Sequence, residues 1–423
     1  MTACSMRPHR WPTWLCLLAL CTLALASRPR PHSLKRRNPT YAPLSDQSLD
    51  ALAVLSDRDE ALDFDDPTSL LAKILVPRVS GTKNLTRVQE LVEGHFSHLG
   101  WANEFDAKTP LGSKPMKNLV FTHDPSAPRR FVLAAHLDSK YFPTHPADQF
   151  VGATDSAAPC AMLLDLATAL TPWLDERKKR VEELGGEEGR EGQGETLQIV
   201  FFDGEEAFVD WTAEDSIYGA KHLAEKWSVT DTSPAPIQST PKSPLRRISH
   251  FVLLDLLGAP NPLMRSFFPN TGWLFDEFLH SEERLGQAGL LWPGFEGNAY
   301  TERKGKIGVP ERSFFVPRNA AGMQMHAGSI EDDHLPFMKA GVPIVHLIAV
   351  PFPSVWHTIR DAATALDLPT IKAWALILRL TVAEYLGLDP SIPPANANKK
   401  RKRDRSELVW PSLSASTQLF DGC

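Results

Sequence analysis

The sequence predicts an α/β fold, a three-layer sandwich with helices on both faces of a mostly parallel central sheet. Two observations lead to this prediction. Short apolar runs, rich in residues that favour strands, alternate along the chain with longer segments of helical periodicity. Several of these runs are apolar throughout, as is typical of strands that are buried on both faces.

The predicted strands are runs of apolar and β-branched residues bounded by turn residues. In chain order they are residues 118–121, 131–135, 197–202, 251–254 and 342–348. Asp124-Pro-Ser126 turns the chain between the first two strands. The third and fourth strands end abruptly in acidic residues.

The predicted helices have apolar residues three and four positions apart. In chain order they are residues 47–55, 86–99, 157–170, 216–226, 274–285 and 369–386, with a further apolar patch at 70–75. The helix over 86–99 carries one apolar stripe. The helix over 157–170 is apolar nearly all round, so we expect it to be buried.

The chain of 423 residues is expected to contain a single domain over residues 45–389. Segment 176–195 is charged and glycine-rich, and segment 231–246 is rich in Ser, Thr and Pro, so both are predicted to be surface loops. The formal charge of −6 gives no reason to expect nucleic acid or an anionic membrane as a partner. We expect a monomer.

Both ends of the chain are expected to lie outside this domain. Residues 1–26 combine basic, apolar and small-residue regions as a secretory signal peptide does, and residues 27–44 are a flexible lead-in. We therefore expect no stable membrane span and a location in the secretory pathway, either secreted or lumenal; retention in the Golgi or ER and an uncleaved anchor stay open. The basic tail 390–423 is predicted to be disordered.

Removal of the signal peptide would leave Cys160 and Cys423, which are too few and too far apart for a disulfide framework. Asn84-Leu-Thr86 is a glycosylation sequon, which becomes meaningful in a secreted protein.

Acidic and histidine residues gather after the predicted strands. They are His136 and Asp138 after the second strand, Asp155 in the next segment, Glu205 and Glu206 after the third strand, Asp255 after the fourth, and Asp332, Asp333, His334, His346 and His357 towards the carboxyl end. Each alone is commonly a hydrogen-bonded core residue or a helix cap. Together they predict a ligand site, because open α/β sheets bind ligands beyond the carboxyl ends of their strands.

The adjacent carboxylates of Glu205 and Glu206 repel each other, so a cation or a difference in environment must separate them. One can ligate a metal while the other accepts and returns protons. A donor set of carboxylates and imidazoles without thiolates favours Zn²⁺ of the catalytic kind, which keeps open coordination positions.

Longer motifs around these residues resemble those of the glutaminyl-peptide cyclotransferases, or glutaminyl cyclases, which share their fold with the secreted zinc aminopeptidases. The matching segments are Ala135-His-Leu-Asp-Ser-Lys-Tyr-Phe142, Phe150-Val-Gly-Ala-Thr-Asp-Ser-Ala157, Pro159-Cys-Ala-Met162, Phe201-Phe-Asp-Gly-Glu-Glu-Ala-Phe208, Asp215-Ser-Ile-Tyr-Gly219, Leu253-Leu-Asp-Leu-Leu-Gly-Ala-Pro-Asn-Pro262, Asp332-Asp-His334, Val345-His-Leu-Ile348 and Pro351-Phe-Pro-Ser-Val-Trp-His-Thr358. The resemblance runs in order from about residue 65 to 388.

This resemblance implies a zinc-aminopeptidase-like fold and a cyclase that converts N-terminal glutamine of peptides and proteins to pyroglutamate with release of ammonia. It implies one zinc per chain, with Asp155, Glu206 and His357 as its ligands, and Glu205 as the general acid and base. Asp255, Asp332 and His346 are then a hydrogen-bonded relay beside Glu205. Trp211, Phe352 and Trp356 are expected to line the pocket for the glutamine side chain.

Two departures from the family pattern stand out. Animal enzymes of the family carry a cysteine where this chain has Ala135, so Cys160 is expected to be a free buried thiol. Glu331 replaces a glutamine, which predicts a different preference among second residues of the substrate.

Two other functions use similar residues. A zinc aminopeptidase needs His136, Asp155, Glu206, Asp255 and His357 around two metal ions, with Glu205 activating water. A catalytically inactive binding module usually lacks ligands or the acid/base, and here all are present. The cyclase is favoured because Trp211, Trp356 and the pair Asp332 and His346 resemble it and have no role in hydrolysis.

Overall fold

The computed structural model describes residues 43–54, 61–108, 114–183, 194–229, 243–291, 313–318 and 330–390. In chain order the elements are α1 (Asp46–Val54), α2 (Leu70–Ile74), α3 (Lys83–Leu99), β1 (Ala102–Lys108), β2 (Met116–Thr122), β3 (Arg129–His136), α4 (Ala158–Glu183), β4 (Glu195–Phe202), α5 (Tyr218–Ser228), β5 (Ile248–Asp255), α6 (Gly272–Gln287), α7 (His334–Lys339), β6 (Ile344–Ile348) and α8 (Leu368–Leu386). Alternating strands and helices thus confirm the predicted α/β fold.

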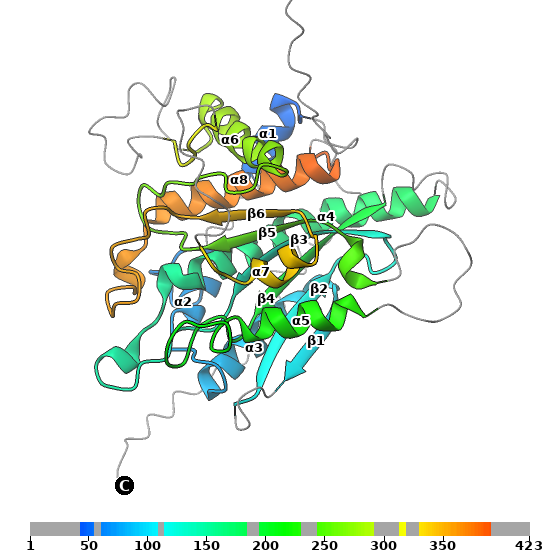
Figure 1. The fold of residues 1–423 in the computed structure, drawn as a ribbon. Helices are drawn as coiled ribbons and strands as arrows, with labels where there is room; N and C mark the ends of the chain where they lie inside the picture. Colours follow the sequence, from blue (N-terminus) through cyan, green and yellow to red (C-terminus); the bar gives the residue numbers. More distant parts are fainter. Residues whose placement is uncertain are drawn as a thin grey trace, which may run out of the picture. The chain divides into compact units, whose positions relative to one another are not determined.

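The strands of the described residues form one six-stranded sheet in the order β1-β2-β4-β3-β5-β6 (Figure 1). Strands β4, β3, β5 and β6 run parallel, whereas β1 pairs with β2 and β2 with β4 in antiparallel fashion. The sheet is therefore mixed. The carboxyl ends of its four parallel strands lie side by side at one end of the sheet. In register, His136 lies opposite Phe202, and Asp255 opposite Ile348.

Two consecutive phenylalanines show how helices cover both faces of the sheet. Phe201 points to the face of α3, where its ring lies 6.0 Å from that of Phe96. Phe202 points to the other face, where its ring lies 5.8 Å from that of Phe337 in α7. Because successive strand residues alternate between faces, α5 and α7 cover one face, and α3, α4 and α8 cover the other (Figure 1).

Helix α4 is buried along most of its length, as its all-round apolar sequence predicts. Among the described residues it belongs to the one helical stretch, 147–183, that is long and apolar enough to cross a membrane, but 89% of the apolar window is buried within the protein. It is therefore a core helix.

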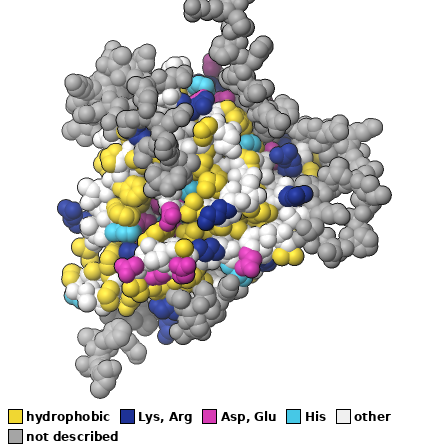
Figure 2. All heavy atoms as spheres, in the orientation of Figure 1, with side chains coloured by type: hydrophobic (Ala, Val, Ile, Leu, Met, Phe, Trp, Pro, Cys, Tyr) yellow, Lys and Arg dark blue, Asp and Glu magenta, His cyan; other side chains and the backbone are white. Residues whose placement is uncertain are grey.

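On the face drawn in Figure 2, Lys and Arg side chains of the described residues are separated by apolar and acidic ones, so no basic patch is gathered there.

Two features differ from the sequence-based expectation. Strand β1 was not predicted, because its sequence is mainly polar, as suits an exposed edge strand. The predicted surface loop over 176–195 is partly wrong, since α4 continues through the charged residues to Glu183 and β4 begins at Glu195. A helix tolerates these charges because several point to solvent while its other side is packed.

Other sequence-based expectations lie mostly outside the described residues. These are the signal peptide 1–26, the lead-in 27–44 apart from its last two residues, the basic tail 390–423 beyond residue 390, and positions 231–242 of the predicted loop 231–246. The remainder of that loop enters a short 3₁₀ helix, Pro244–Arg247.

A buried ion pair joins α4 to α8. Arg379 donates from Nε to Asp165 Oδ2 at 3.0 Å and from Nη2 to Asp165 Oδ1 at 2.6 Å, with both residues almost wholly buried. Replacing Arg379 by Met leaves an unpaired buried carboxylate, so we expect the free energy of unfolding to fall by about 3–5 kcal/mol.

The matched control is the double variant Asp165→Leu/Arg379→Met, in which both charges are removed. Denaturant unfolding should show it to be more stable than the single variant. Equal losses in the two proteins would mean that packing volume, not the unpaired charge, sets the cost.

Candidate metal and active site

The three predicted metal ligands meet beyond the carboxyl ends of the parallel strands. Asp155, Glu206 and His357 each bring one ligand atom within 4.8 Å of the others. His357 Nε2 lies 3.4 Å from Asp155 Oδ2 and 3.3 Å from Glu206 Oε1. Segments far apart in the sequence thus supply one compact group of two carboxylates and an imidazole.

The chemistry of this group fits a divalent cation. Asp155 Oδ2 and Glu206 Oε1 are buried and have no hydrogen-bond partner among the described residues. A buried carboxylate oxygen without a partner is costly, and a cation between the two oxygens would remove that cost. Oxygen and nitrogen donors without thiolate suit zinc with an open coordination position.

His357 and Asp155 are held together through the residues around them. The Asp361 carboxylate accepts a hydrogen bond from the Thr154 backbone N–H at 2.8 Å, and its carbonyl accepts one from the Ala153 N–H at 3.0 Å. The turn that carries His357 is therefore bonded directly to the turn that carries Asp155.

Arg78, which is 0% exposed, makes hydrogen bonds to the backbone of the same region. Its Nε donates to the Leu137 carbonyl at 2.6 Å, and its Nη atoms donate to the carbonyls of Val151 and Gly152. It therefore joins the segment after β3 to the segment that carries Asp155. Sequence reasoning missed it, because an isolated arginine beside a proline gives no signal of such a role.

Asp138 holds the backbone of the glutamate pair. Its carboxylate oxygens accept hydrogen bonds from the backbone N–H groups of Glu205 and Glu206, each at 3.2 Å. Its carbonyl lies 3.1 Å from His136 Nδ1. The sequence singled out Asp138 as an acid after a strand but assigned it no role; the fold makes it the clamp that orients both glutamates.

The environments of the two glutamates differ. Burial, together with the charges of Glu206 and Asp332, raises the pKa of the Glu205 carboxyl well above its usual value, against the opposing effect of His136. Glu206 faces His357 with one oxygen and accepts a hydrogen bond from Lys140 Nζ with the other, at 3.2 Å. Glu205 is thus suited to carry a proton, whereas Glu206 faces the other members of the ligand group.

Asp255 lies beside a second group of ligand-type atoms. His136, Asp155 and Asp255 bring atoms within 4.8 Å, and His136 Nε2 lies 2.9 Å from Asp155 Oδ1. Asp255 Oδ1 also accepts hydrogen bonds from Ser156 Oγ at 2.5 Å and from the Leu256 N–H at 2.7 Å. Burial raises the Asp255 pKa to about 6, partly offset by the hydrogen bond with His136.

Of the predicted relay, Asp332 and His346 are joined, whereas no hydrogen bond within the described residues links either of them to Asp255. His346 Nε2 lies 2.8 Å from Asp332 Oδ2, with both side chains buried. Burial would raise the pKa of Asp332, but the contact with His346 outweighs it and lowers the pKa. Neither residue lies at a strand end: Asp332 precedes α7, and His346 lies within β6.

The aromatic residues predicted for the pocket fall into two sets. Phe352 and Trp356 contact each other with ring centroids 5.0 Å apart, and the Trp356 indole stacks on the His357 ring at 3.8 Å. Trp211 instead donates from Nε1 to Glu331 Oε2 at 3.0 Å. Trp356 and Trp211 are 39% and 37% exposed, so both residues are accessible to a substrate.

Backbone strain also marks the site. His357 and Leu256, which follows Asp255, have φ angles of 53° and 52°, in the left-handed region that non-glycine residues rarely adopt. Such conformations persist where surrounding contacts hold them, commonly at functional sites.

Cys160 is a free, buried thiol as predicted, with its pKa raised by burial to about 12.

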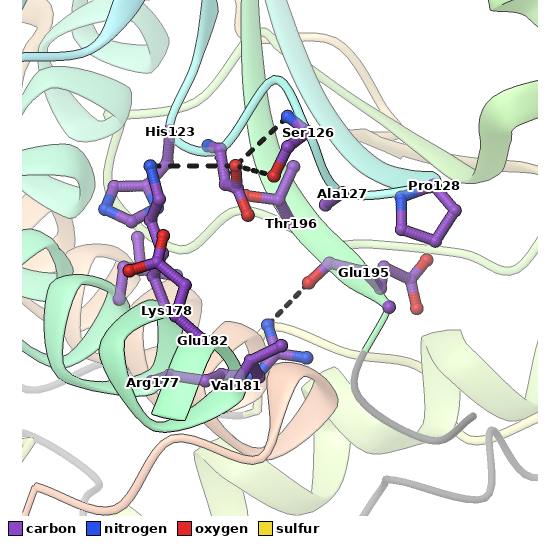
Figure 3. A pocket seen from close by; sticks show the side chains of 13 residues that line it. His123, Ser126, Ala127, Pro128, Arg177, Lys178, Val181, Glu182, Glu195 and Thr196 are labelled. Carbon is purple, nitrogen blue, oxygen red and sulfur yellow. Dashed lines mark hydrogen bonds and ion pairs between the residues drawn. The ribbon is translucent and has the colours of Figure 1, made fainter. Parts of the chain in front are cut away.

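A small cavity of about 60 Å³ lies at the opposite end of the parallel strands (Figure 3). Figure 3 shows Arg177 pointing towards Glu195, close to the start of β4. None of the predicted site residues lines this cavity, and cationic and acidic side chains are mixed in its wall. It therefore indicates no particular ligand.

Comparison with known proteins identifies the family. The profile of peptidase family M28 matches residues 118–288 and 314–382. A glutaminyl-peptide cyclotransferase from Drosophila melanogaster is 42% identical over 318 residues, which cover 74% of this chain and 78% of the relative. The enzyme of that name from Bos taurus is 39% identical over 323 residues, covering 75% and 81%.

A solved structure agrees with these sequence matches. The crystal structure of Macrostomum lignano glutaminyl cyclase superposes with a TM-score of 0.66 at 34% identity, covering 83% of this chain and 96% of that one. The residues matched by the M28 family profile include Asp155, Glu205, Glu206 and His357. The chain therefore belongs to the glutaminyl-peptide cyclotransferases, within peptidase family M28.

Proposed function

We propose that this protein cyclises the N-terminal glutamine of peptides and proteins to pyroglutamate and releases ammonia. The observation that carries the proposal is the buried Glu205, with its raised pKa, beside the ligand group Asp155, Glu206 and His357. The names of the relatives from Drosophila and cattle support the same reaction.

We further propose one zinc per chain, held by Asp155, Glu206 and His357. Zinc held there would supply a Lewis acid that polarises the γ-amide oxygen of the substrate and stabilises negative charge developing on it. The two buried carboxylate oxygens without hydrogen-bond partners among the described residues support this ligand assignment.

The protein side chains then handle the proton and the orientation. The substrate α-amine attacks its own γ-carbonyl carbon, so a new C–N bond forms while the bond to the amide nitrogen breaks. Glu205 accepts the proton that the amine loses and returns it to the departing nitrogen, which leaves as ammonia. Asp255 holds the amine or the ammonia by a charge-assisted hydrogen bond, and the Asp332–His346 pair supports this arrangement.

The aromatic residues are proposed to hold the glutamine in its ring-closing conformation. Trp356 stacks on the ligand His357, so its indole cannot move far without disturbing the metal group. With Phe352 and Trp211 it would enclose the flat γ-amide and exclude the water that would give hydrolysis.

Hydrolysis by a two-zinc aminopeptidase is the second candidate, and one observation favours it. The group His136, Asp155 and Asp255 shares Asp155 with the first group, as two neighbouring metal sites do. Against it, Asp255 Oδ1 is already engaged by Ser156 and by the Leu256 N–H.

The setting of the reaction is also a proposal. A signal peptide over 1–26 would direct the enzyme to the secretory pathway as a secreted or lumenal monomer. Asn84 of the sequon lies in the first turn of α3, and its side-chain amide donates to the Pro77 carbonyl at 2.9 Å.

The glutamate pair provides a test of the assigned roles. Glu206→Gln should lose zinc and activity together, because a ligand is removed. Glu205→Gln should keep zinc and fold but lose kcat by about 10²–10⁴-fold, the usual contribution of a general acid and base. Zinc content by elemental analysis and kcat are measured on the same samples; near-normal kcat in Glu205→Gln would refute its role.

Product analysis separates cyclase from peptidase. Gln-initiated peptides should yield pyroglutamyl peptide and ammonia, whereas Leu- and Ala-initiated peptides should stay intact. Trp356→Ala should lose most of its kcat/KM on glutamine substrates with zinc content unchanged. The neighbouring exposed Ile359 gives a matched control, since Ile359→Ala should have little effect. Release of free leucine at a rate comparable to cyclisation would instead establish the aminopeptidase.

Glu331 is proposed to select among second residues of the substrate, because its exposed carboxylate accepts a hydrogen bond from Trp211, one of the residues proposed to line the substrate pocket. Glu331→Gln should raise kcat/KM for an acidic second residue relative to a basic one by about two- to fivefold, the size of an exposed charge interaction. Asp175→Asn, an exposed charge removed elsewhere, should leave that ratio unchanged. The same ratio in wild type and Glu331→Gln would exclude this role.

A further inference from the structure

We propose that Asp332, His334 and His346 form a second zinc site, whose occupation inhibits the enzyme. These residues each bring one ligand atom within 4.8 Å of the others. The group shares no residue with Asp155, Glu206 and His357, so it can bind a cation independently of them. One carboxylate and two imidazoles are ligands that zinc commonly takes.

His334 supplies the independent observation that points to a ligand. It is 1% exposed, and neither of its ring nitrogens has a hydrogen-bond partner among the described residues. Its described ring neighbours are Phe268 at 5.5 Å and His346 at 4.6 Å between centroids. A buried polar group left unpaired is destabilising, so an imidazole kept in this position is unexplained by packing alone.

The other two members are already close enough to share an ion. Asp332 Oδ2 and His346 Nε2 lie 2.8 Å apart, and the His334 ring is inclined by 43° to that of His346. Zinc bound by all three residues would need small side-chain movements, because ligand atoms lie about 2.0–2.2 Å from the ion. The cluster lies close to the catalytic group, since the Asp332 charge acts on both Glu205 and Asp255.

Occupation of this site would remove the hydrogen bond between Asp332 and His346. That pair belongs to the relay, so the inhibition rests on the proposed function, whereas the binding itself does not. The expected behaviour is an enzyme that is active with one equivalent of zinc and inhibited by excess zinc.

The test titrates the purified full-length enzyme with Co²⁺ and with Zn²⁺, measuring bound metal by visible absorption and elemental analysis, and cyclisation separately. Wild type should bind a second equivalent and lose activity as it binds. With one equivalent of metal bound, His334→Leu should have the same activity as wild type. It should bind the second equivalent of metal about tenfold or more weakly. His145→Leu, which removes an exposed histidine, is the matched control and should behave as wild type.

Metal binding is followed without reference to turnover, so a wrong reaction assignment would leave the second equivalent measurable. If His334→Leu does not fold, His334→Asn takes its place, with the wild-type stoichiometry as the companion measurement. A second equivalent retained by the variant would overturn the proposal and point to the group of His136, Asp155 and Asp255. Wild type that binds only one equivalent would overturn it as well.

Discussion

Repulsion among buried carboxylates at the carboxyl ends of the parallel strands is the constraint on which this site depends. Asp138, Asp155, Glu205, Glu206, Asp255 and Asp332 are all buried there. Such a group persists only if cations, hydrogen bonds or protonation compensate each charge. His136 and His357 face Asp155, backbone N–H groups face Asp138, and Glu205 and Asp255 have raised pKa values.

Hydrogen bonds to the backbone hold these carboxylates in place, so their positions are fixed by geometry as well as by charge. Arg78 binds carbonyl groups in two segments that lead to Asp138 and Asp155. Asp361 then ties the Asp155 turn to the His357 turn. The backbone of Asp155 is held by Arg78 and that of Glu206 by Asp138. One oxygen of each carboxylate, Asp155 Oδ2 and Glu206 Oε1, then faces His357 Nε2 at 3.4 and 3.3 Å, where a cation could bind between them.

The same edge separates two kinds of surface. Behind the candidate metal ligands lie buried polar groups joined by hydrogen bonds. In front of them stand the exposed indoles of Trp211 and Trp356 and the carboxylate of Glu331. The inner groups suit chemistry on one small amide, and the outer ones suit recognition of the residues around it. The stacking contact between Trp356 and His357 connects the inner and outer groups.

The sequence by itself determined the strand and helix pattern, the zinc-type ligand set and the family, because these depend on local periodicity and on long motifs. It determined Asp155, Glu206 and His357 as a group through resemblance, and the fold brings them together. Only the tertiary structure decided what Arg78, Asp138 and Asp361 do, since their partners are backbone groups of distant segments. It alone placed polar strand β1 at the sheet edge and left His334 buried without a partner among the described residues, because burial and pairing arise only when distant segments pack.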